Sequence, residues 1–550
     1  MFSSLKKNYF YLFIFTSAIL FCIGYDYAYP IQANPDEVAQ LKNVYAMIQS
    51  KSLALQYPSS YSIWTHYIYL IPVVLYWGVF YLFSDLNSIV ELKLYIMNNY
   101  FQVMPFLRLF TALMFFVSLF YIREVLKNLL NELQANLFFI FVSLNLLVVI
   151  NAHYAKHWIV DTSLIFFSMY FYYKYNLERE KLKYALFSFF LFSFGTLSSY
   201  PLILSGVYFL LIYFYFNKSY KLLIKDILLF LAVFSLMILY TVKMGFGGIV
   251  QNATSSLNFS FESLFKLLYC SFDYDPFLFI FFLVSLILLI KDKNIKFLIA
   301  LIAYLGYLIT ISFYHVEPRY ALFLVIDAAF LATFFLYHLY NKNKTLFKGL
   351  IFVYMAFNLF LAVNWLNIIT KKDTRLEVVD WLKQNISKEE KDFVIYNTWG
   401  FNYLPLTKNS INEIKNICPN SITTRERLHL KYNLNDGIDG AILWKIDQDK
   451  SCDIVDVVKY LKNKSYKVIF INERFGKAAI FDQPSKKSFE RVKNRFYLNK
   501  IKEFVPYRND PKEIEKIGDI ILNFENPLQT MYYLKQSGPK IDIYEIETKE

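Results

Sequence analysis

Long apolar stretches fill the chain from residue 9 to residue 366 and then stop. A helix needs roughly 20 apolar residues to cross a bilayer, although shorter spans are tolerated. The pattern predicts eleven membrane spans. Two of them form a hairpin of short helices over 184–216, interrupted at Gly195–Pro201. The other nine cover 9–25, 106–122, 135–150, 159–173, 227–244, 277–290, 297–313, 320–340 and 346–366.

The segment 61–83 is also apolar enough to span, and counting it would reverse the orientation of everything after it. With the N-terminus inside and this segment not spanning, the inner segments hold 17 Lys and Arg, against 8 in much longer outer loops. Positive residues concentrate on the cytoplasmic side. The aromatic segment 61–83 is therefore predicted to lie at the membrane interface. The N-terminus is predicted to be cytoplasmic.

The composition changes at about residue 370. Residues 371–550 carry 32 Lys and Arg and 27 Asp and Glu, with short apolar runs between polar stretches. Strands are predicted at Phe393–Tyr396, Lys467–Ile471, Ala478–Phe481 and Ile541–Ile546, and helices at Thr374–Gln384 and Ile454–Lys462.

The expected fold is a polytopic α-helical membrane protein of about 11 spans over 1–370, followed by an α/β domain over 371–550. Counting the spans places this domain outside the cytoplasm, on the periplasmic face of the inner (plasma) membrane. Cys418 and Cys452 both lie in the domain, so a disulfide and two buried thiols are both open interpretations.

Charge and composition narrow the class of protein. Hydrophobic residues make up 56% of the chain and charged ones only 18%, below the roughly 25% of soluble proteins. A soluble enzyme and a disordered chain are thereby excluded. The net charge of +13 would suggest nucleic acid in a soluble protein. Here the basic residues of the apolar region gather in the short inner segments. The positive charge is therefore explained by the orientation in the membrane, and no nucleic-acid partner is expected.

The first outer loop, over 26–105, carries an acidic pair. Asp36 and Glu37 follow Pro35 and are predicted to occupy the first turn of a helix that runs to about Ser50. Carboxylates are favoured there by the helix dipole. An ordinary helix start therefore explains the pair as well as a functional site does.

The second outer loop is short and polar. It places His153, Lys156, His157 and Asp161 within eleven residues. A lysine at the edge of a bilayer often has no function beyond extending its ammonium group to the polar headgroups. Asp161 lies three residues into an apolar run, where a carboxylate is costly unless it faces a polar cavity.

Two arginines are expected on the same outer face. Arg319 lies with Glu317 in a short loop between two spans, and Arg108 begins its span from that side. Asp327 lies deeper, where a solvated pore, a contact between helices and a functional site are all open. These cations and carboxylates could together hold a phosphate and activate a hydroxyl group.

The order of these motifs resembles the GT-C superfamily of integral-membrane glycosyltransferases. It is most similar to bacterial relatives of protein O-mannosyltransferases and of the lipid A aminoarabinose transferase. The matching elements are the pair Asp36-Glu37, the segment Arg108–Leu113, Asp161-Thr-Ser-Leu, Pro318-Arg-Tyr-Ala-Leu-Phe323, Asp373-Thr-Arg375 and Gly538-Pro-Lys540. Lys156 stands near the place where the family has an arginine.

The resemblance implies transfer of a sugar from a polyprenyl-phosphate donor to a lipid, glycan or protein acceptor. Asp36 would be the general base of an inverting reaction, Glu37 would orient the acceptor, and Asp161 would position the acceptor or stabilise developing positive charge. Arg319 would pair with the lipid phosphate, together with Lys156, His153, His157 or Arg108. No cofactor is required, and a divalent metal ion is compatible with this chemistry although no ligand spacing indicates one.

Two other functions remain as alternatives. A transporter or flippase of lipid-linked glycans would explain the spans, but paired halves with matching broken helices are not evident in the sequence. A membrane polymerase or ligase would use the same donors, but such enzymes rely on large late outer loops rich in Arg and His. Here the long outer loop is the first one, and it carries acidic residues. The sequence does not specify the sugar, the lipid carrier or the acceptor.

Overall fold

The computed structural model describes residues 13–29, 35–57, 61–217, 219–244, 259–313, 318–386, 391–396, 406–422, 426–427, 430–431, 437–474, 483–508 and 527–549. The chain divides into two compact units. The first consists of residues 1–25, 36–80 and 105–366. The second consists of 26–35, 81–104 and 367–550, so that parts of the first outer loop group with the C-terminal domain.

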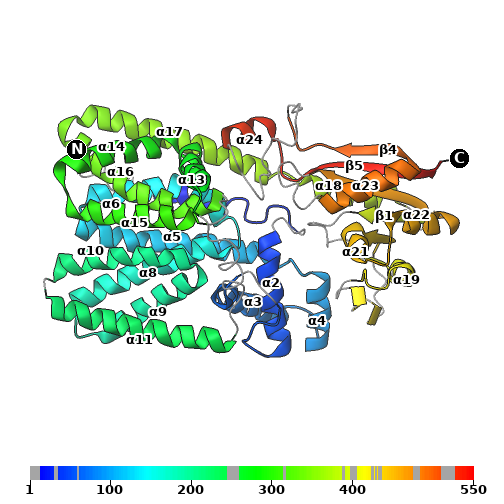
Figure 1. Cartoon of the computed structure of the whole chain (residues 1–550), viewed down its shortest axis with the longest axis horizontal. Helices are drawn as coiled ribbons and strands as arrows, with labels where there is room; N and C mark the ends of the chain where they lie inside the picture. The colour runs from blue at the N-terminus through cyan, green and yellow to red at the C-terminus, as the bar shows by residue number, and fades with distance from the viewer. Residues whose placement is uncertain are drawn as a thin grey trace. The chain divides into compact units, whose positions relative to one another are not determined.

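Helices build the first unit (Figure 1). In chain order they are Phe13–Cys22, α2 (Pro35–Ser50), α3 (Ile63–Phe83), α5 (Met104–Leu129), α6 (Glu132–Leu144), α7 (Leu146–Ala152), α8 (His157–Leu177), α9 (Leu182–Ser198), η1 (Tyr200–Gly206), α10 (Val207–Phe216), α11 (Tyr220–Met244), α13 (Phe261–Tyr274), α14 (Pro276–Asp292), α15 (Ile295–Ile311), η2 (Pro318–Ala321), α16 (Leu322–Lys342) and α17 (Lys344–Ile369). Each of the eleven predicted spans is therefore helical, including the hairpin of α9 and α10.

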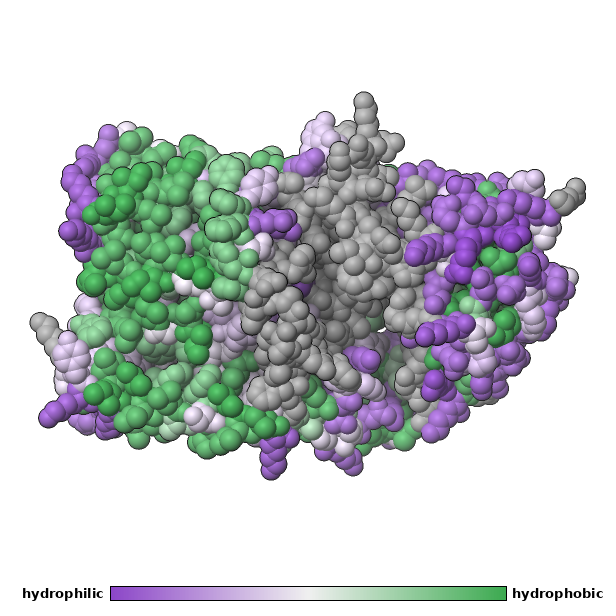
Figure 2. Space-filling view, in the orientation of Figure 1, coloured by the Kyte–Doolittle hydropathy of each residue, from purple (hydrophilic) through white to green (hydrophobic). Residues whose placement is uncertain are grey.

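Apolar side chains cover these helices (Figure 2). Within the described residues, five helices are long and apolar enough to cross a membrane, or seven if each of two bent pairs counts as one span. Four shorter apolar helices accompany them: Phe13–Cys22, Leu182–Ser198, Tyr200–Phe216 and Ile295–Ile311. The chain is thus a polytopic α-helical membrane protein, as predicted.

Two of the helical stretches are bent at polar caps. The axes of α6 and α7 meet at 62° at Asn145, and those of α13 and α14 at 117° at Asp275. Each side chain accepts a hydrogen bond from the following helix, from the Leu147 and Leu278 N–H groups respectively. The two caps also bind each other, because Asn145 Nδ2 donates to Asp275 Oδ2 over 3.1 Å. This contact explains why the stretch predicted as one span over 135–150 is broken.

The helix α3, predicted to lie at the interface, contacts the ends of three other helices. By length and hydropathy it is one of the five possible spans. However, Trp64 Nε1 donates to Thr241 in the last turn of α11, and Thr65 bonds to Ser198 at the end of α9. Farther along, Tyr76 packs on Phe106 at the start of α5. All three neighbours lie at helix ends predicted to be outside, so α3 crosses the ends of the bundle.

The ends predicted to be inside also meet one another. Arg179, after α8, forms a salt bridge of 2.8 Å with Asp226 in the first turns of α11. His338, near the end of α16, lies 3.6 Å from Asp292 at the end of α14. Each contact joins the ends of two helices, and the orientation in the membrane stays a prediction.

The C-terminal domain is built on a five-stranded sheet in the order β2-β1-β3-β5-β4. The strands are β1 (Asp392–Tyr396), β2 (Gly440–Ile442), β3 (Lys467–Arg474), β4 (Phe496–Phe504) and β5 (Lys540–Thr548). β2, β1 and β3 are parallel, whereas β5 pairs antiparallel with β3 and β4. The helices in this unit are α4 (Ile89–Asn98), α18 (Thr374–Asn385), α19 (Lys408–Ile417), α21 (Leu443–Gln448), α22 (Ile454–Asn463), α23 (Gln483–Arg495) and α24 (Pro527–Tyr533).

Both faces of the sheet are covered, because successive side chains of a strand point to opposite faces. In β3, Val468 and Phe470 pack into a core with α21, α22 and α23, while Ile469 and Ile471 pack into a second core with α18. The predicted helices and three of the four predicted strands are confirmed. The fourth, Ala478–Phe481, lies outside the described residues. β2 and β4 were not predicted, and the α/β fold class is confirmed.

The start of the domain binds a segment from near the end of the chain. Thr374 donates from its backbone N–H to Ser537 O over 3.1 Å and from its hydroxyl to Pro539 O over 2.7 Å. Gly538 lies between them with a positive φ of 100°, and a Cβ there would come within 2.1 Å of Thr374 Oγ1. Glycine is therefore required at this position. The two C-terminal motifs noted in the sequence form one buried contact.

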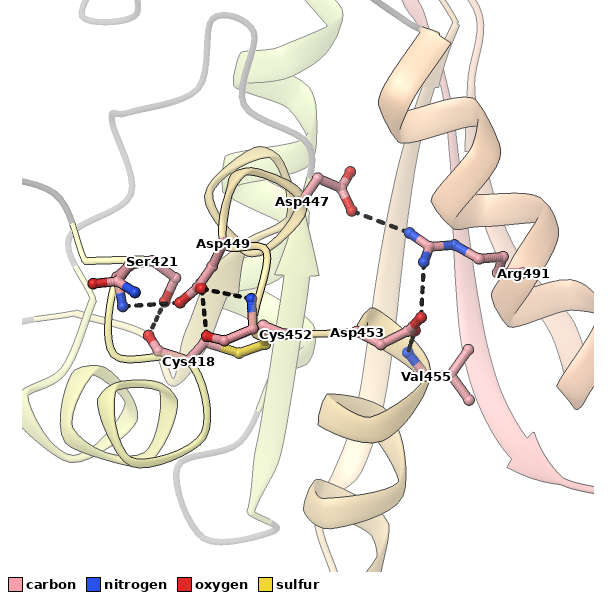
Figure 3. The surroundings of a disulfide bond; sticks show 10 residues. Cys418, Ser421, Asp447, Asp449, Cys452, Asp453, Val455 and Arg491 are labelled. Carbon is pink, nitrogen blue, oxygen red and sulfur yellow. Dashed lines mark hydrogen bonds and ion pairs between the residues drawn. A yellow bond between two sulfur atoms is a disulfide. The ribbon is translucent and has the colours of Figure 1, made fainter.

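A disulfide joins Cys418 to Cys452 (Figure 3). It links the end of α19 to the segment before α22, and the Cα atoms are 5.4 Å apart. Asp449 holds the same segment by accepting hydrogen bonds from the Asn420 and Ser451 N–H groups. Of the two interpretations left open by the sequence, the structure therefore shows the disulfide.

Candidate functional site

The first turn of α2 is fixed by a buried ion pair. Glu37 accepts hydrogen bonds from Arg108 Nε at 2.9 Å and Nη2 at 2.8 Å, and a third from the Ala155 N–H at 2.9 Å. Both charged side chains are 2% exposed. Arg108 Nη1 also donates to Tyr25 O over 3.4 Å. Since the guanidinium binds Glu37, Arg108 holds α2, α5 and the second outer loop together, which is a different task from the phosphate contact predicted for it.

His153 has a similar structural part. Its Nδ1 lies 2.7 Å from Val149 O, and its Nε2 lies 2.7 Å from Ile23 O. The ring also packs edge-on against Trp365. Both nitrogens face backbone carbonyl oxygens, so in this arrangement neither is directed to a phosphate.

His157 lies at the centre of a polar cluster at the start of α8. Its Nδ1 is 3.3 Å from Gln40 Nε2, and the backbone carbonyl oxygen of Gln40 is 3.2 Å from His66 Nδ1. Gln40, from α2, and His66, from α3, are both buried. The cluster therefore joins the N-terminal turns of α2, α3 and α8. Gln40 and His66 were not singled out in the sequence, although Gln40 follows Asp36 by four residues.

Asp161 occupies the next turn of α8, on the same face as His157 because the two are four residues apart. Its carboxylate is fully buried, and Ser199 Oγ donates to Oδ2 over 2.5 Å. Among the described residues, Oδ1 has no hydrogen-bond partner. Ser199, between α9 and η1, thus supplies one polar contact to this carboxylate. Gly195, in the last turn of α9, lets the backbone of α9 come close to Asp161 O, which would lie 3.2 Å from a Cβ at that position.

Lys156 and Arg319 flank this region. Lys156 immediately precedes α8, is 3% exposed and lies over the Tyr154 ring at 5.0 Å. Arg319, in η2, is partly exposed and lies 5.5 Å from the centre of the Tyr320 ring. Tyr320 in turn packs edge-on on Trp158, the second residue of α8.

The position of Asp36 is given by its helix. Asp36 belongs to the first turn of α2, one turn before Gln40, but its side chain lies outside the described part of the structure. Glu317 also lies outside the described residues. Gln40, one turn after Asp36 in α2, contacts His157, which lies one turn before Asp161 in α8. Through His157 and Trp158, the start of α8 thus contacts α2 and η2.

Asp327 has a partner of its own. Tyr208 of α10 donates to its Oδ1 over 2.6 Å. Of the three interpretations that the sequence left open, a hydrogen bond between helices is the one observed. Among the described residues, no group of three or more His, Cys, Asp or Glu side chains is placed to hold a metal ion.

Comparisons with known proteins add a likeness of overall structure. No family model and no curated protein sequence matches the chain. Solved structures do match it in overall fold. The apo structure of ArnT from Cupriavidus metallidurans is 11% identical with a TM-score of 0.48, over 88% of this chain and 95% of ArnT. The same enzyme bound to undecaprenyl phosphate gives 11% identity and a TM-score of 0.48, over 86% and 94%.

An oligosaccharyltransferase from Archaeoglobus fulgidus, in complex with zinc and sulfate, is 11% identical with a TM-score of 0.46, over 89% of this chain and 71% of that one. ArnT is a lipid A aminoarabinose transferase, one of the enzymes that the sequence motifs resemble. At this degree of likeness the function has to be argued from the side chains described above.

Proposed function

We propose that this chain is a membrane glycosyltransferase that moves a sugar from a polyprenyl-phosphate donor to an acceptor on the extracytoplasmic face. The observation that carries the proposal is the cluster around His157. His157 contacts Gln40, which follows Asp36 by one turn of α2, and the neighbouring Trp158 packs on Tyr320, next to Arg319 in η2. Asp161 follows His157 by one turn of α8. A base, a second carboxylate and cations for a phosphate are the groups that such a transfer needs.

In this proposal Asp36 takes the proton of the acceptor hydroxyl as its oxygen attacks the anomeric carbon. The bond from that carbon to the phosphate oxygen breaks, the configuration inverts, and the lipid leaves as a phosphate. Lys156 and Arg319 stabilise the charge of the leaving phosphate. Asp161 orients the acceptor or stabilises the positive charge that develops on the sugar.

Glu37 and Arg108 act as positioning residues. Their mutual ion pair fixes the first turn of α2, and hence the backbone of Asp36, against the loop that carries Lys156. The donor phosphate is therefore assigned to Lys156, Arg319 and His157, while His153 and Arg108 support the fold around them. A divalent metal ion would find Asp36 and Asp161 as oxygen donors, and no step above requires it.

The orientation in the membrane is part of the proposal. The basic inner segments favour a cytoplasmic N-terminus, and eleven spans then place residues 371–550 outside. The disulfide between Cys418 and Cys452 supports this placement, because disulfides persist in oxidising compartments such as the periplasm.

The test uses purified full-length protein in lipid nanodiscs and a panel of undecaprenyl-phosphate hexoses and pentoses, with envelope lipids and glycans as acceptors. Release of undecaprenyl phosphate is measured. Asp36→Asn should lower release at least about 100-fold, as expected for loss of a positioned base. Arg319→Leu should instead weaken binding of undecaprenyl phosphate.

Asp85→Asn is the matched control, because Asp85 is an exposed carboxylate of the same outer loop. Near-normal release by Asp36→Asn would overturn the assignment of the base. Growth of a repeating glycan in the assay would indicate a polymerase, and movement of the donor across the bilayer without release would indicate a flippase.

A further inference from the structure

The helix α13 lies across the direction of the helices beside it. It is separated from α14 by a bend of 117°, and Figure 1 shows it crossing the common direction of α14, α15 and α16. Its N-terminal end is tied to the end of α15, because the Ser260 N–H donates to Ser312 O over 3.1 Å. It packs against α14, α15 and η2. No span is predicted here, and the predicted spans at 227–244 and 277–290 leave this stretch in an outer loop.

The side chains of α13 fall into three sectors at about 100° per residue. One arc of roughly 80° carries four large aromatic residues that are 42–68% exposed. They are Phe261, Phe265, Tyr269 and Phe272. The next, narrow arc is polar and consists of Glu262, Lys266 and Asp273. The arc after that is buried in the protein and consists of Leu267, Cys270, Ser271 and Tyr274.

We propose that α13 is an interfacial helix whose aromatic arc is immersed in the outer leaflet of the bilayer while its polar arc faces water. This inference does not rest on the proposed sugar transfer; only the choice of the outer leaflet rests on the orientation proposed above. A helix that lies in the membrane plane has one apolar side, one polar side and, beside a protein, a third side that packs on it. Tyr is enriched at the level of the headgroups, and Phe is typical of the apolar side of an interfacial helix.

The lipid bilayer is the partner that the neighbouring surface indicates. α14 follows α13 directly and exposes a row of apolar side chains along its length. They include Ile280, Leu283, Ile287 and Ile290, which are 43–77% exposed. The aromatic arc of α13 therefore lies next in the chain to a surface that a spanning helix presents to lipid. Four exposed aromatic residues would be unfavourable in water.

The position of α13 also affects η2. η2, which carries Arg319, packs on α13. A helix held at the interface by its aromatic arc therefore also fixes η2 near the headgroups, the level at which the phosphate of any lipid lies.

The experiment measures depth directly with nitroxide labels on single cysteines in full-length protein reconstituted in phosphatidylglycerol–phosphatidylethanolamine nanodiscs. Cys22→Ser and Cys270→Ala remove the free thiols, and the disulfide is left intact. Labels are placed at Phe265 and Phe272 in the aromatic arc and at Glu262 and Lys266 in the polar arc. Ile287 on α14 provides the lipid-exposed reference.

Collisions with oxygen, which partitions into lipid, are compared with collisions with a water-soluble nickel chelate. Labels at Phe265 and Phe272 should favour oxygen, as at Ile287, and labels at Glu262 and Lys266 should favour nickel. The two labels in each arc guard against one variant that fails to fold. Nickel-accessible labels at both aromatic positions, or labels immobilised and shielded from both reagents by protein, would overturn the proposal.

Discussion

The ion pair of Glu37 and Arg108 predicts a large local loss of stability when only one charge is removed. In Glu37→Gln the side chain keeps its size, but its amide NH₂ group faces the donors of Arg108. Removing one partner of a buried pair leaves an uncompensated charge and costs about 3–5 kcal/mol. Three hydrogen bonds end on this carboxylate, so we expect about 3 kcal/mol as a lower figure.

Hydrogen exchange at the amide of Ala155 measures this loss directly, because that N–H donates to Glu37. A change of 1.36 kcal/mol is tenfold in an equilibrium constant, so 3 kcal/mol should speed exchange by roughly 100-fold or more. Glu124→Gln, which changes an exposed carboxylate of α5, is the matched control and should leave Ala155 unchanged.

The double variant Glu37→Leu with Arg108→Met removes both charges and should melt at a higher temperature than Glu37→Gln, because no buried charge is left without a partner. If Ala155 in Glu37→Gln exchanges within about threefold of the wild-type rate, less than 1 kcal/mol by the same conversion, the pair does not hold α2 as we infer.

Three further predictions follow from other contacts. Ser199→Ala should slow sugar transfer about tenfold, since it removes a hydrogen bond to the Asp161 carboxylate. Ser199→Thr should restore the rate, and equal rates for all three proteins would contradict the positioning role. Replacing Cys418 and Cys452 by serine should destabilise the C-terminal domain by about 2–4 kcal/mol, visible as faster hydrogen exchange in β1 and β3. Protection that is unaffected would show that the disulfide adds nothing. Burial raises the pKa of Asp447, opposed by Ser488 and Arg491, so the folded domain favours its protonated form. Stability is therefore lost as the pH rises from the unfolded pKa through the folded one. Asp447→Asn should thus protect α21 and α23 from exchange at neutral pH relative to wild type, with the difference vanishing at about pH 3. A difference that grows on acidification would refute this assignment.

Local chemistry explains what the sequence could predict. Pro35 followed by two carboxylates predicts a helix start, and α2 begins there and ends at Ser50 as expected. The turn at 195–201 predicted the hairpin of α9 and α10. The cost of a carboxylate in an apolar run predicted a polar cavity at Asp161; among the described residues the structure shows one hydrogen bond, from Ser199, and no partner for Oδ1.

Long-range contacts explain what the sequence could not predict. Glu37 and Arg108 are 71 positions apart, and nothing in either local pattern selects the other. The bend at Asn145 depends on its contact with Asp275, 130 positions later. β2 has only three residues, and β4 is an edge strand with a mainly polar, exposed pattern, so neither gives the apolar signal of a buried strand.

The place of β5 in the sheet has a consequence for the order of assembly. β5 is synthesised after every other strand of the sheet, yet it lies between β3 and β4 and supplies pairing to both. The segment just before it also binds Thr374, the first residue of α18. Until residues 537–548 have left the ribosome and reached their compartment, no strand lies between β3 and β4. Thr374, at the start of α18, also lacks the backbone partner that Ser537 provides. A chain stopped before residue 537 would therefore present two unpaired strand edges to proteases and chaperones, although more than nine-tenths of it had been made.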